Sequence, residues 1–231
     1  LKVLLKCTLK DKRVIVTVRD LYSLRFLNSI GIKSKLIPPP SLVVSRMYAD
    51  SHVRKEGNYV LIVPRVHFGS KSYLVEFINY LRTKNFEVIL IGQSFENNFV
   101  DNDLSAISEI VKNVRDSKSL IVKDKVDLYE YLKLLFNAKI VISERAIAIV
   151  AALSMGVPSI GIDVYGGKTR GLMELFGVED FCISVKKVSC KKLVDIFNTM
   201  IANYTKIQLN LIEKSNELYK DCINIIKDIF R

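Results

Sequence analysis

Short apolar runs alternate with longer amphipathic stretches along most of the chain, a pattern typical of strands and helices in turn. The short runs are rich in Val and Ile and are apolar throughout, which indicates strands that are buried on both faces of a sheet. These runs predict strands over 14–18, 59–63, 88–91, 120–122, 139–142, 159–162 and 182–185.

The stretches between these runs carry apolar residues at helical spacing, as Leu74, Phe77, Ile78 and Leu81 do. Asp20 is expected to cap one such helix. The pattern predicts helices over 1–12, 21–30, 73–84, 103–115, 128–136, 147–155, 172–176 and 190–231, the last in two pieces that meet near 203–205. Buried strands in alternation with helices predict an α/β fold, a doubly wound parallel sheet of the Rossmann-like kind.

The chain is interrupted once, by three consecutive prolines at 38–40 and a polar, charged stretch over 45–58. Such a segment is typical of a domain boundary. We therefore interpret residues 1–50 as the end of an N-terminal Rossmann-like domain plus a linker, and residues 51–231 as a C-terminal Rossmann-like domain with C-terminal helices. The N-terminal remnant has few neighbours to cover its strand, so we expect a homodimer or a separate N-terminal partner chain.

Composition narrows the possible ligands. The 231 residues carry a formal net charge of +11, with four cysteines far apart and only two histidines. No metal-ligand spacing occurs, so we expect no metal site, reduced thiols and a cytoplasmic protein. The longest apolar stretch, 146–162, is short and contains Gly and Pro, which argues against a transmembrane segment. The charge suits an anionic ligand; without an aromatic platform or recognition helix we expect no nucleic acid.

Four basic residues follow predicted strands: Arg19, Arg65, Arg145 and Lys168. Ligands of doubly wound sheets bind outside the carboxyl ends of the strands, so these cations are candidates for binding an anion. A single Arg after a strand is more often a surface or ion-pair residue than a ligand, and for Arg19 we expect pairing with Asp20 or with a neighbouring helix.

Two further residues are candidate proton-transfer groups. Glu144 follows the strand over 139–142 and His67 comes two residues after Arg65. An Arg partner for Glu144 and a satisfied polar role for His67 are the alternatives. No glycine-rich nucleotide loop is present, and 166–169, GGKT, is interpreted as a basic turn because the preceding glycine of a phosphate loop is missing. We expect no cofactor.

Several segments resemble one enzyme family. Segment 14–23 reads VIVTVRDLYS, segment 59–65 reads YVLIVPR, and segment 142–148 reads ISERAIA, followed by GVP at 156–158. Together with Lys168 and GVED at 177–180, they resemble motifs of the polysaccharide pyruvyl transferase family, over about residues 14–190.

The resemblance implies a GT-B-like fold and transfer of a pyruvyl group from phosphoenolpyruvate to a saccharide as a ketal. On matching positions, Arg65 and Arg145 would hold the phosphate or carboxylate of phosphoenolpyruvate, and Lys168 would line the same cleft. The His of the family motif S-x-R-L-H-A is Ile147 here, and Ile147 cannot transfer a proton. Two alternatives therefore stay open: a GT-B glycosyltransferase or epimerase that uses a nucleotide sugar, and a non-catalytic or partner-dependent binding module.

Overall fold

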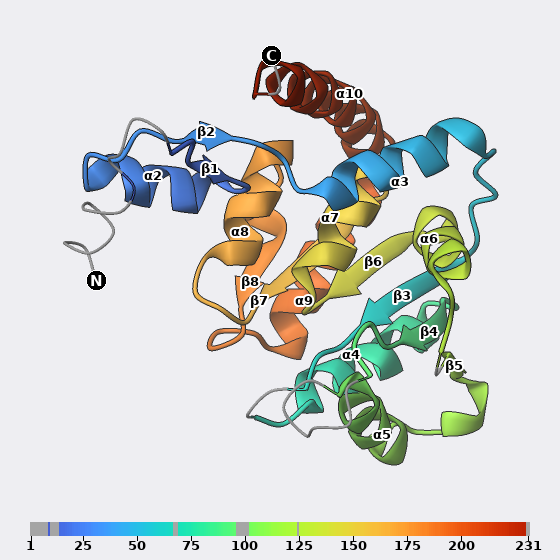
Figure 1. Cartoon of the computed structure of the whole chain (residues 1–231). Coiled ribbons are helices and arrows are strands. Elements are labelled where there is room, and N and C mark those ends of the chain that lie inside the picture. The colour runs from blue at the N-terminus through green and yellow to red at the C-terminus, as the bar shows by residue number, and fades with distance from the viewer. Residues whose placement is uncertain (1–8, 10–13, 67–68, 96–101, 124, 230–231) are drawn as a thin grey trace.

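The computed structural model describes residues 9, 14–66, 69–95, 102–123 and 125–229. Its main feature is a six-stranded parallel sheet with the strand order β5-β4-β3-β6-β7-β8 (Figure 1). The strands are β3 (Tyr59–Val63), β4 (Glu87–Ile91), β5 (Ile121–Lys123), β6 (Ile140–Ser143), β7 (Ser159–Asp163) and β8 (Cys182–Ser184). The chain order reverses between β3 and β6, as in a doubly wound Rossmann-like sheet, so the predicted fold class is confirmed.

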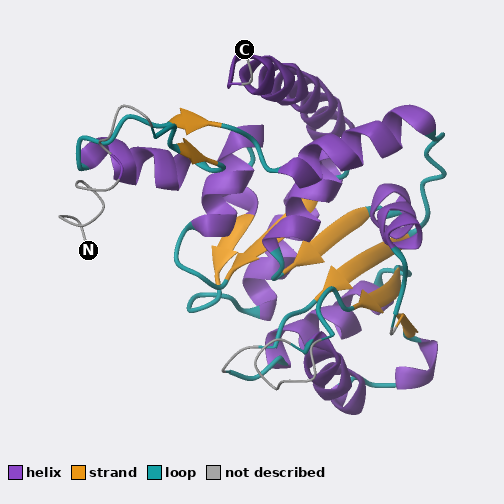
Figure 2. Ribbon diagram, viewed as in Figure 1, coloured by secondary structure: helices purple, strands orange, loops and turns teal. Residues whose placement is uncertain are grey.

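Helices cover both faces of this sheet (Figure 2). One face packs against α4 (Ser72–Thr83), α5 (Asp103–Asn113) and α9 (Cys190–Ala202). The other face carries α3 (Pro40–Ser51), α6 (Leu128–Asn137), α7 (Ala146–Ser154) and α8 (Lys168–Met173), with α10 (Tyr204–Ile229) against α3 and α7. Short 3-10 turns lie at Ser117–Ser119, Glu174–Phe176 and Glu179–Phe181.

Alternation along β3 illustrates why these strands are apolar throughout. Val60 and Ile62 belong to the core under α4, whereas Leu61 and Val63 belong to the core under α6 and α7. Successive side chains point to opposite faces of a sheet, so a strand with helices on both sides has no polar position.

The N-terminal part forms a small unit of its own, β1 (Thr17–Val18), α2 (Leu21–Ser29) and β2 (Lys35–Leu36), with the two strands parallel. The side chain of Asp20 accepts the N–H of Ser23 and caps α2, as predicted. Gly31, at φ 73°, ends the helix in a left-handed conformation. The helix predicted over 1–12 lies outside the described residues except for Leu9.

The segment predicted as a polar linker was only partly interpreted correctly, because it contains the helix α3. Pro40 stands in the first turn of α3, where its missing N–H costs no hydrogen bond. Leu42 and Tyr48 are buried against α7 and α6. The prolines therefore start a helix that packs on the C-terminal domain.

Within the described ranges, no helix is long and apolar enough to cross a bilayer. Over the same part of the chain, no group of three or more His, Cys, Asp or Glu side chains could hold a metal ion. Cys182, Cys190 and Cys222 are free thiols.

Apolar side chains of the N-terminal unit are exposed. Ile15 and Tyr22 are 57% and 53% accessible, and Val14 and Phe26 are also exposed. Parallel strands normally occur in larger sheets that are covered on both faces, and a two-stranded sheet is marginally stable alone. The exposed apolar residues, which lie just before β1 and on α2, thus form a surface that another α/β element could cover.

We accordingly expect the chain to dimerise through residues 1–50 when no partner chain is present. Ile15→Lys should shift sedimentation at micromolar concentration from dimer to monomer, because a charge at the centre of an apolar contact is unfavourable. Leu209→Lys, at a position 61% exposed on α10, is the matched control and should leave the dimer intact. A monomeric wild-type chain would contradict the prediction.

Candidate functional site

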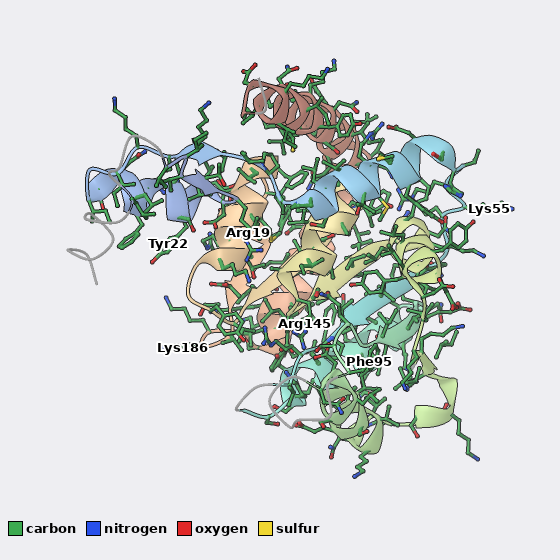
Figure 3. All side chains as sticks on the ribbon, in the orientation of Figure 1. Arg19, Tyr22, Lys55, Phe95, Arg145 and Lys186 are labelled. Carbon is green, nitrogen blue, oxygen red and sulfur yellow. The ribbon has the colours of Figure 1, made fainter. Side chains whose placement is uncertain are left out.

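The strands β3, β6 and β7 all end at the same edge of the sheet, on either side of the point where the strand order reverses. Arg65 follows β3, Glu144 and Arg145 follow β6, and Lys168 follows β7. This is the edge at which doubly wound sheets bind ligands. Figure 3 shows Arg145 at the strand ends and Arg19 between the N-terminal unit and α8.

Two cations lie near the ring of Tyr165, and a third lies close to one of them. The guanidinium carbon of Arg65 lies 4.6 Å from the ring centroid of Tyr165, and Lys168 Nζ lies 6.0 Å from the same centroid. Burial lowers the pKa of the Lys168 ammonium, and the positive charges of Arg19 and Arg65 lower it further. Arg19 and Arg65 are therefore each within electrostatic reach of Lys168, and we call the three residues the cation cluster.

A cleft of about 920 Å³ opens beside the cation cluster, between the N-terminal unit, α3 and α10. Its polar lining includes Arg19, Asp20, Tyr165 and Lys168, so one carboxylate lies in the cleft with the cations. The rest of the lining is mostly apolar and comes from Thr17, Val18, Tyr22, Ser23, Ile37, Pro38, Pro39, Pro40, Val43, Val44, Cys222 and Ile226.

The turn that carries Lys168 is held by Asp163, the last residue of β7. The buried Asp163 carboxylate accepts the N–H of Gly167 and, at 3.2 Å, the N–H of Thr169. Gly167 has φ 120°, and a Cβ there would lie 3.1 Å from the Tyr22 ring. Gly167 thus lets the turn pass close to α2, and Lys168 lines the same crevice as Arg19. Helix α8 begins at Lys168, earlier than the start predicted at 172.

Arg145 is buried, and two nitrogens of its guanidinium donate hydrogen bonds to the carboxylate of Asp103, the first residue of α5. Its Nε donates to Oδ2 at 3.1 Å, and its Nη2 donates to Oδ1 at 2.6 Å. Asp103 also accepts the N–H groups of Gln93 and Ser94 at 2.9 and 3.0 Å. Arg145 therefore ties the end of β6 to the loop after β4, and the structure does not place it in the cation cluster.

Glu144 is buried as well. Its Oε2 accepts Lys71 Nζ and the backbone N–H of Arg65, both at 2.6 Å, and its Oε1 accepts the hydroxyl of Tyr73. Burial lowers the pKa of the Lys71 ammonium, and the Glu144 carboxylate opposes that effect. The other candidate proton-transfer residue, His67, lies outside the described residues.

Ile147, which the resemblance to the family motif aligns with a His, is half exposed in the first turn of α7. On one side it contacts the same crevice as Arg19 and Lys168. On the other side it lines a pocket of about 280 Å³ with Phe95 and Tyr131. Ile147 thus contributes an apolar surface to both the crevice and the pocket.

Sequence reasoning missed four residues of this edge: Lys71, Tyr73, Asp103 and Tyr165. Lys71, Tyr73 and Asp103 lie at the starts of helices, where a charged or polar residue is ordinarily interpreted as a cap. Tyr165 follows β7 by two residues, and only its position after a strand could have pointed to it.

Solved structures share this architecture. A glycosyltransferase from Rickettsia africae ESF-5 matches with a TM-score of 0.61 and 15% identity over 100% of this chain and 67% of that protein. Anabaena HepE in complex with UDP-glucose matches with a TM-score of 0.60 and 14% identity over 98% and 68%. The UDP-GlcNAc 2-epimerase of Neisseria meningitidis, bound to UDP-GlcNAc, matches with a TM-score of 0.57 and 14% identity over 91% and 59%.

The fold is therefore that of a GT-B-like Rossmann half, and the chain spans about three fifths to two thirds of these three proteins. No curated protein sequence matches the chain. A sequence family does match: polysaccharide pyruvyl transferase, over residues 1–165, which include every member of the cation cluster except Lys168. The match covers well over half of the 231 residues, and the chain belongs to the polysaccharide pyruvyl transferase family.

Proposed function

We propose that this chain provides the donor-binding part of a pyruvyl transferase, which transfers pyruvyl from phosphoenolpyruvate to a saccharide as a ketal. The observation that carries the proposal is that Arg65 and Lys168 lie beside the Tyr165 ring at the ligand-binding edge of the sheet, while Arg19 lines the same cleft as Lys168. Phosphoenolpyruvate carries a phosphate and a carboxylate, and guanidinium groups bind both in a planar, two-pronged fashion.

The reaction sets the roles that a complete site must fill. A proton is added to the methylene carbon of phosphoenolpyruvate, two sugar oxygens bond to the neighbouring carbon, and the bond from that carbon to the phosphate oxygen breaks. One hydroxyl proton balances the new methyl group, and the other leaves with phosphate or solvent. The cation cluster would stabilise the departing phosphate.

Proton transfer is the role that this chain does not obviously fill, because Ile147 replaces the family His. We therefore expect phosphoenolpyruvate to bind while turnover by this chain alone is slow or absent. The opposite wall of the cleft, from a second Rossmann-like domain in a longer protein or in a separate chain, would complete the site and hold the saccharide.

The alternative is a GT-B enzyme that uses a nucleotide sugar, and the pocket lined by Phe95, Tyr131 and Ile147 is the observation in its favour. Aromatic walls of this kind suit a planar ring. Calorimetry with phosphoenolpyruvate and with UDP-glucose separates the two proposals. Binding of neither ligand would favour the third possibility, a non-catalytic, partner-dependent module.

The binding half of the proposal predicts the effect of removing one cation. Arg65→Ala should weaken phosphoenolpyruvate binding roughly tenfold to a hundredfold, because a charge-assisted contact is worth about 1.5–3 kcal/mol. Calorimetry measures this, with Arg25→Ala as control, since Arg25 pairs with Glu174 away from the cleft. Arg145→Ala is a poorer test because it leaves the buried Asp103 carboxylate without its partner. Equal affinity of Arg65→Ala and wild type would remove Arg65 from the site.

Burial of the Lys168 ammonium, together with repulsion from Arg19 and Arg65, predicts a trade-off between stability and binding. A lysine whose pKa falls on folding lowers the free energy of unfolding while it is protonated. This destabilisation becomes smaller as the pH rises from the pKa in the folded state towards 10.5. Lys168→Met should therefore raise the thermal midpoint at pH 7 by roughly 1–3 °C, since partly exposed charge pairs contribute roughly 0.2–1 kcal/mol. The same variant should bind phosphoenolpyruvate more weakly.

Thermal unfolding at pH 7 and at pH 10.5 tests this sign, because the gain from Lys168→Met should shrink at the higher pH. Lys214→Met is the control: Lys214 pairs with the exposed Glu217 on α10, so its loss should bring no gain. A Lys168→Met variant that is less stable than wild type at pH 7 would show that Lys168 is not held under repulsion.

The missing proton-transfer group predicts a gain of function. Ile147→His should raise pyruvyl transfer well above the wild-type rate, because general acid–base catalysis typically contributes about 10²–10⁴-fold. Ile147→Asn, polar but unable to transfer a proton, is the matched control. Release of phosphate from phosphoenolpyruvate in the presence of a saccharide is measured. Equal rates for the His and Asn variants would contradict the assignment of this position.

A further inference from the structure

A single buried carboxylate connects the two ends of the loop between β3 and α4. Glu144 Oε2 accepts the backbone N–H of Arg65, where the loop leaves the sheet, and Lys71 Nζ, where the loop enters α4. The hydroxyl of Tyr73, in the first turn of α4, donates to the other oxygen of the same carboxylate. The two ends of the loop that carries Arg65 are therefore joined through the side chain of Glu144, the residue directly after β6.

The surroundings hold this carboxylate in one place. The side chains of Lys71 and Glu144 are each 1% exposed. The backbone N–H of Glu144 donates to the carbonyl of Val63 at 3.1 Å, and the N–H of Lys71 donates to Glu109 Oε1 on α5 at 2.8 Å. Both ends of the closed loop are thus bound to parts of the fold that do not belong to the loop.

Stability alone does not account for a lysine and a glutamate at these positions. Removing two charges from water costs so much that a buried ion pair is often no more stabilising than apolar residues of the same size. An ion pair does, however, impose a geometry that apolar residues do not, because each oxygen must meet its donor. The donor that matters for the site is the Arg65 N–H, since the Arg65 guanidinium stacks on Tyr165 in the cation cluster.

We propose that Glu144 is a positioning residue: its carboxylate fixes the backbone at Arg65 so that the Arg65 guanidinium reaches the anion-binding site beside Tyr165. The inference rests on the proposed function in taking the cation cluster as an anion-binding site. Both oxygens of Glu144 already accept hydrogen bonds from the loop and α4, and this geometry suits a clamp better than an acid–base catalyst.

Two double variants separate the loss of the hydrogen-bond acceptor at position 144 from the loss of the Lys71–Glu144 ion pair. Lys71→Met/Glu144→Gln and Lys71→Met/Glu144→Leu both remove the ion pair, but only the Gln variant retains an oxygen that can accept the Arg65 N–H. We expect the Gln variant to bind inorganic phosphate within about twofold of wild type and the Leu variant to bind it roughly tenfold more weakly, as loss of about one well-placed contact would give. Calorimetry at constant ionic strength measures both.

A background without Arg65 separates positioning from general loss of structure. In Arg65→Ala, the Gln and Leu double variants should bind phosphate with equal affinity, because the guanidinium that the clamp places is gone. A tenfold difference that persists in Arg65→Ala would overturn the proposal, as would a Leu variant that binds phosphate as wild type does.

If wild type does not bind phosphate, that result counts against the proposed function and not against the clamp. The clamp is then tested by hydrogen exchange at the Arg65 amide, measured by NMR. The amide should be protected in wild type and in the Gln variant, and exchange freely in the Leu variant; equal exchange in all three overturns the clamp.

If the Leu variant does not fold, exchange at the Arg65 amide is compared between Tyr73→Phe and the control Tyr80→Phe. Among the hydrogen bonds described, the Tyr80 hydroxyl bonds only to the exposed Asn198. Faster exchange at Arg65 in Tyr73→Phe alone supports the clamp, and unchanged exchange overturns it.

Discussion

Two consecutive residues at the end of β6, Glu144 and Arg145, connect the loops at the carboxyl edge of the sheet through buried ion pairs. Glu144 binds both ends of the β3–α4 loop, and Arg145 binds Asp103, which in turn holds the loop after β4. Because β6 lies at the point where the strand order reverses, the two side chains can reach loops that are far apart in sequence. The geometry of the candidate site depends on these pairs, since each leaves a buried charge if its partner is lost.

The cation cluster itself is assembled from three separate parts of the chain. Arg19 comes from the N-terminal unit, Arg65 from the β3–α4 loop and Lys168 from the turn after β7. Burial and the positive charges of Arg19 and Arg65 together lower the pKa of Lys168, so its ammonium is held at a cost. The ring of Tyr165 lies against Arg65, and Asp163 holds the turn that carries Lys168, so a bound anion would offset part of a repulsion that the fold maintains.

Family membership and the environment of Ile147 are two independent observations about this edge of the sheet. The family is a transferase family, and the match covers residues 1–165. Ile147 is half exposed and lines a small crevice together with Arg19 and Lys168. The proposed anion-binding role rests on the cation cluster and the proposed proton-transfer role on the position of Ile147, so the two proposals can be tested separately.

Local patterns in the sequence determined the elements and the fold class. Apolar strands such as 59–63 and helices such as 73–84 are encoded by periodicity, and the strand ends placed Arg65, Glu144 and Lys168 at one edge because parallel strands end together. The helix α3 could not be predicted, because it follows three prolines and its burial depends on contact with α7, which is distant in sequence. Which charges face the cleft and which are buried was likewise decided by tertiary structure. Arg145 and Arg65 both follow strands, but only packing brings Asp103 to the first and Tyr165 to the second, because ion pairs and stacked rings join residues without any fixed spacing along the chain.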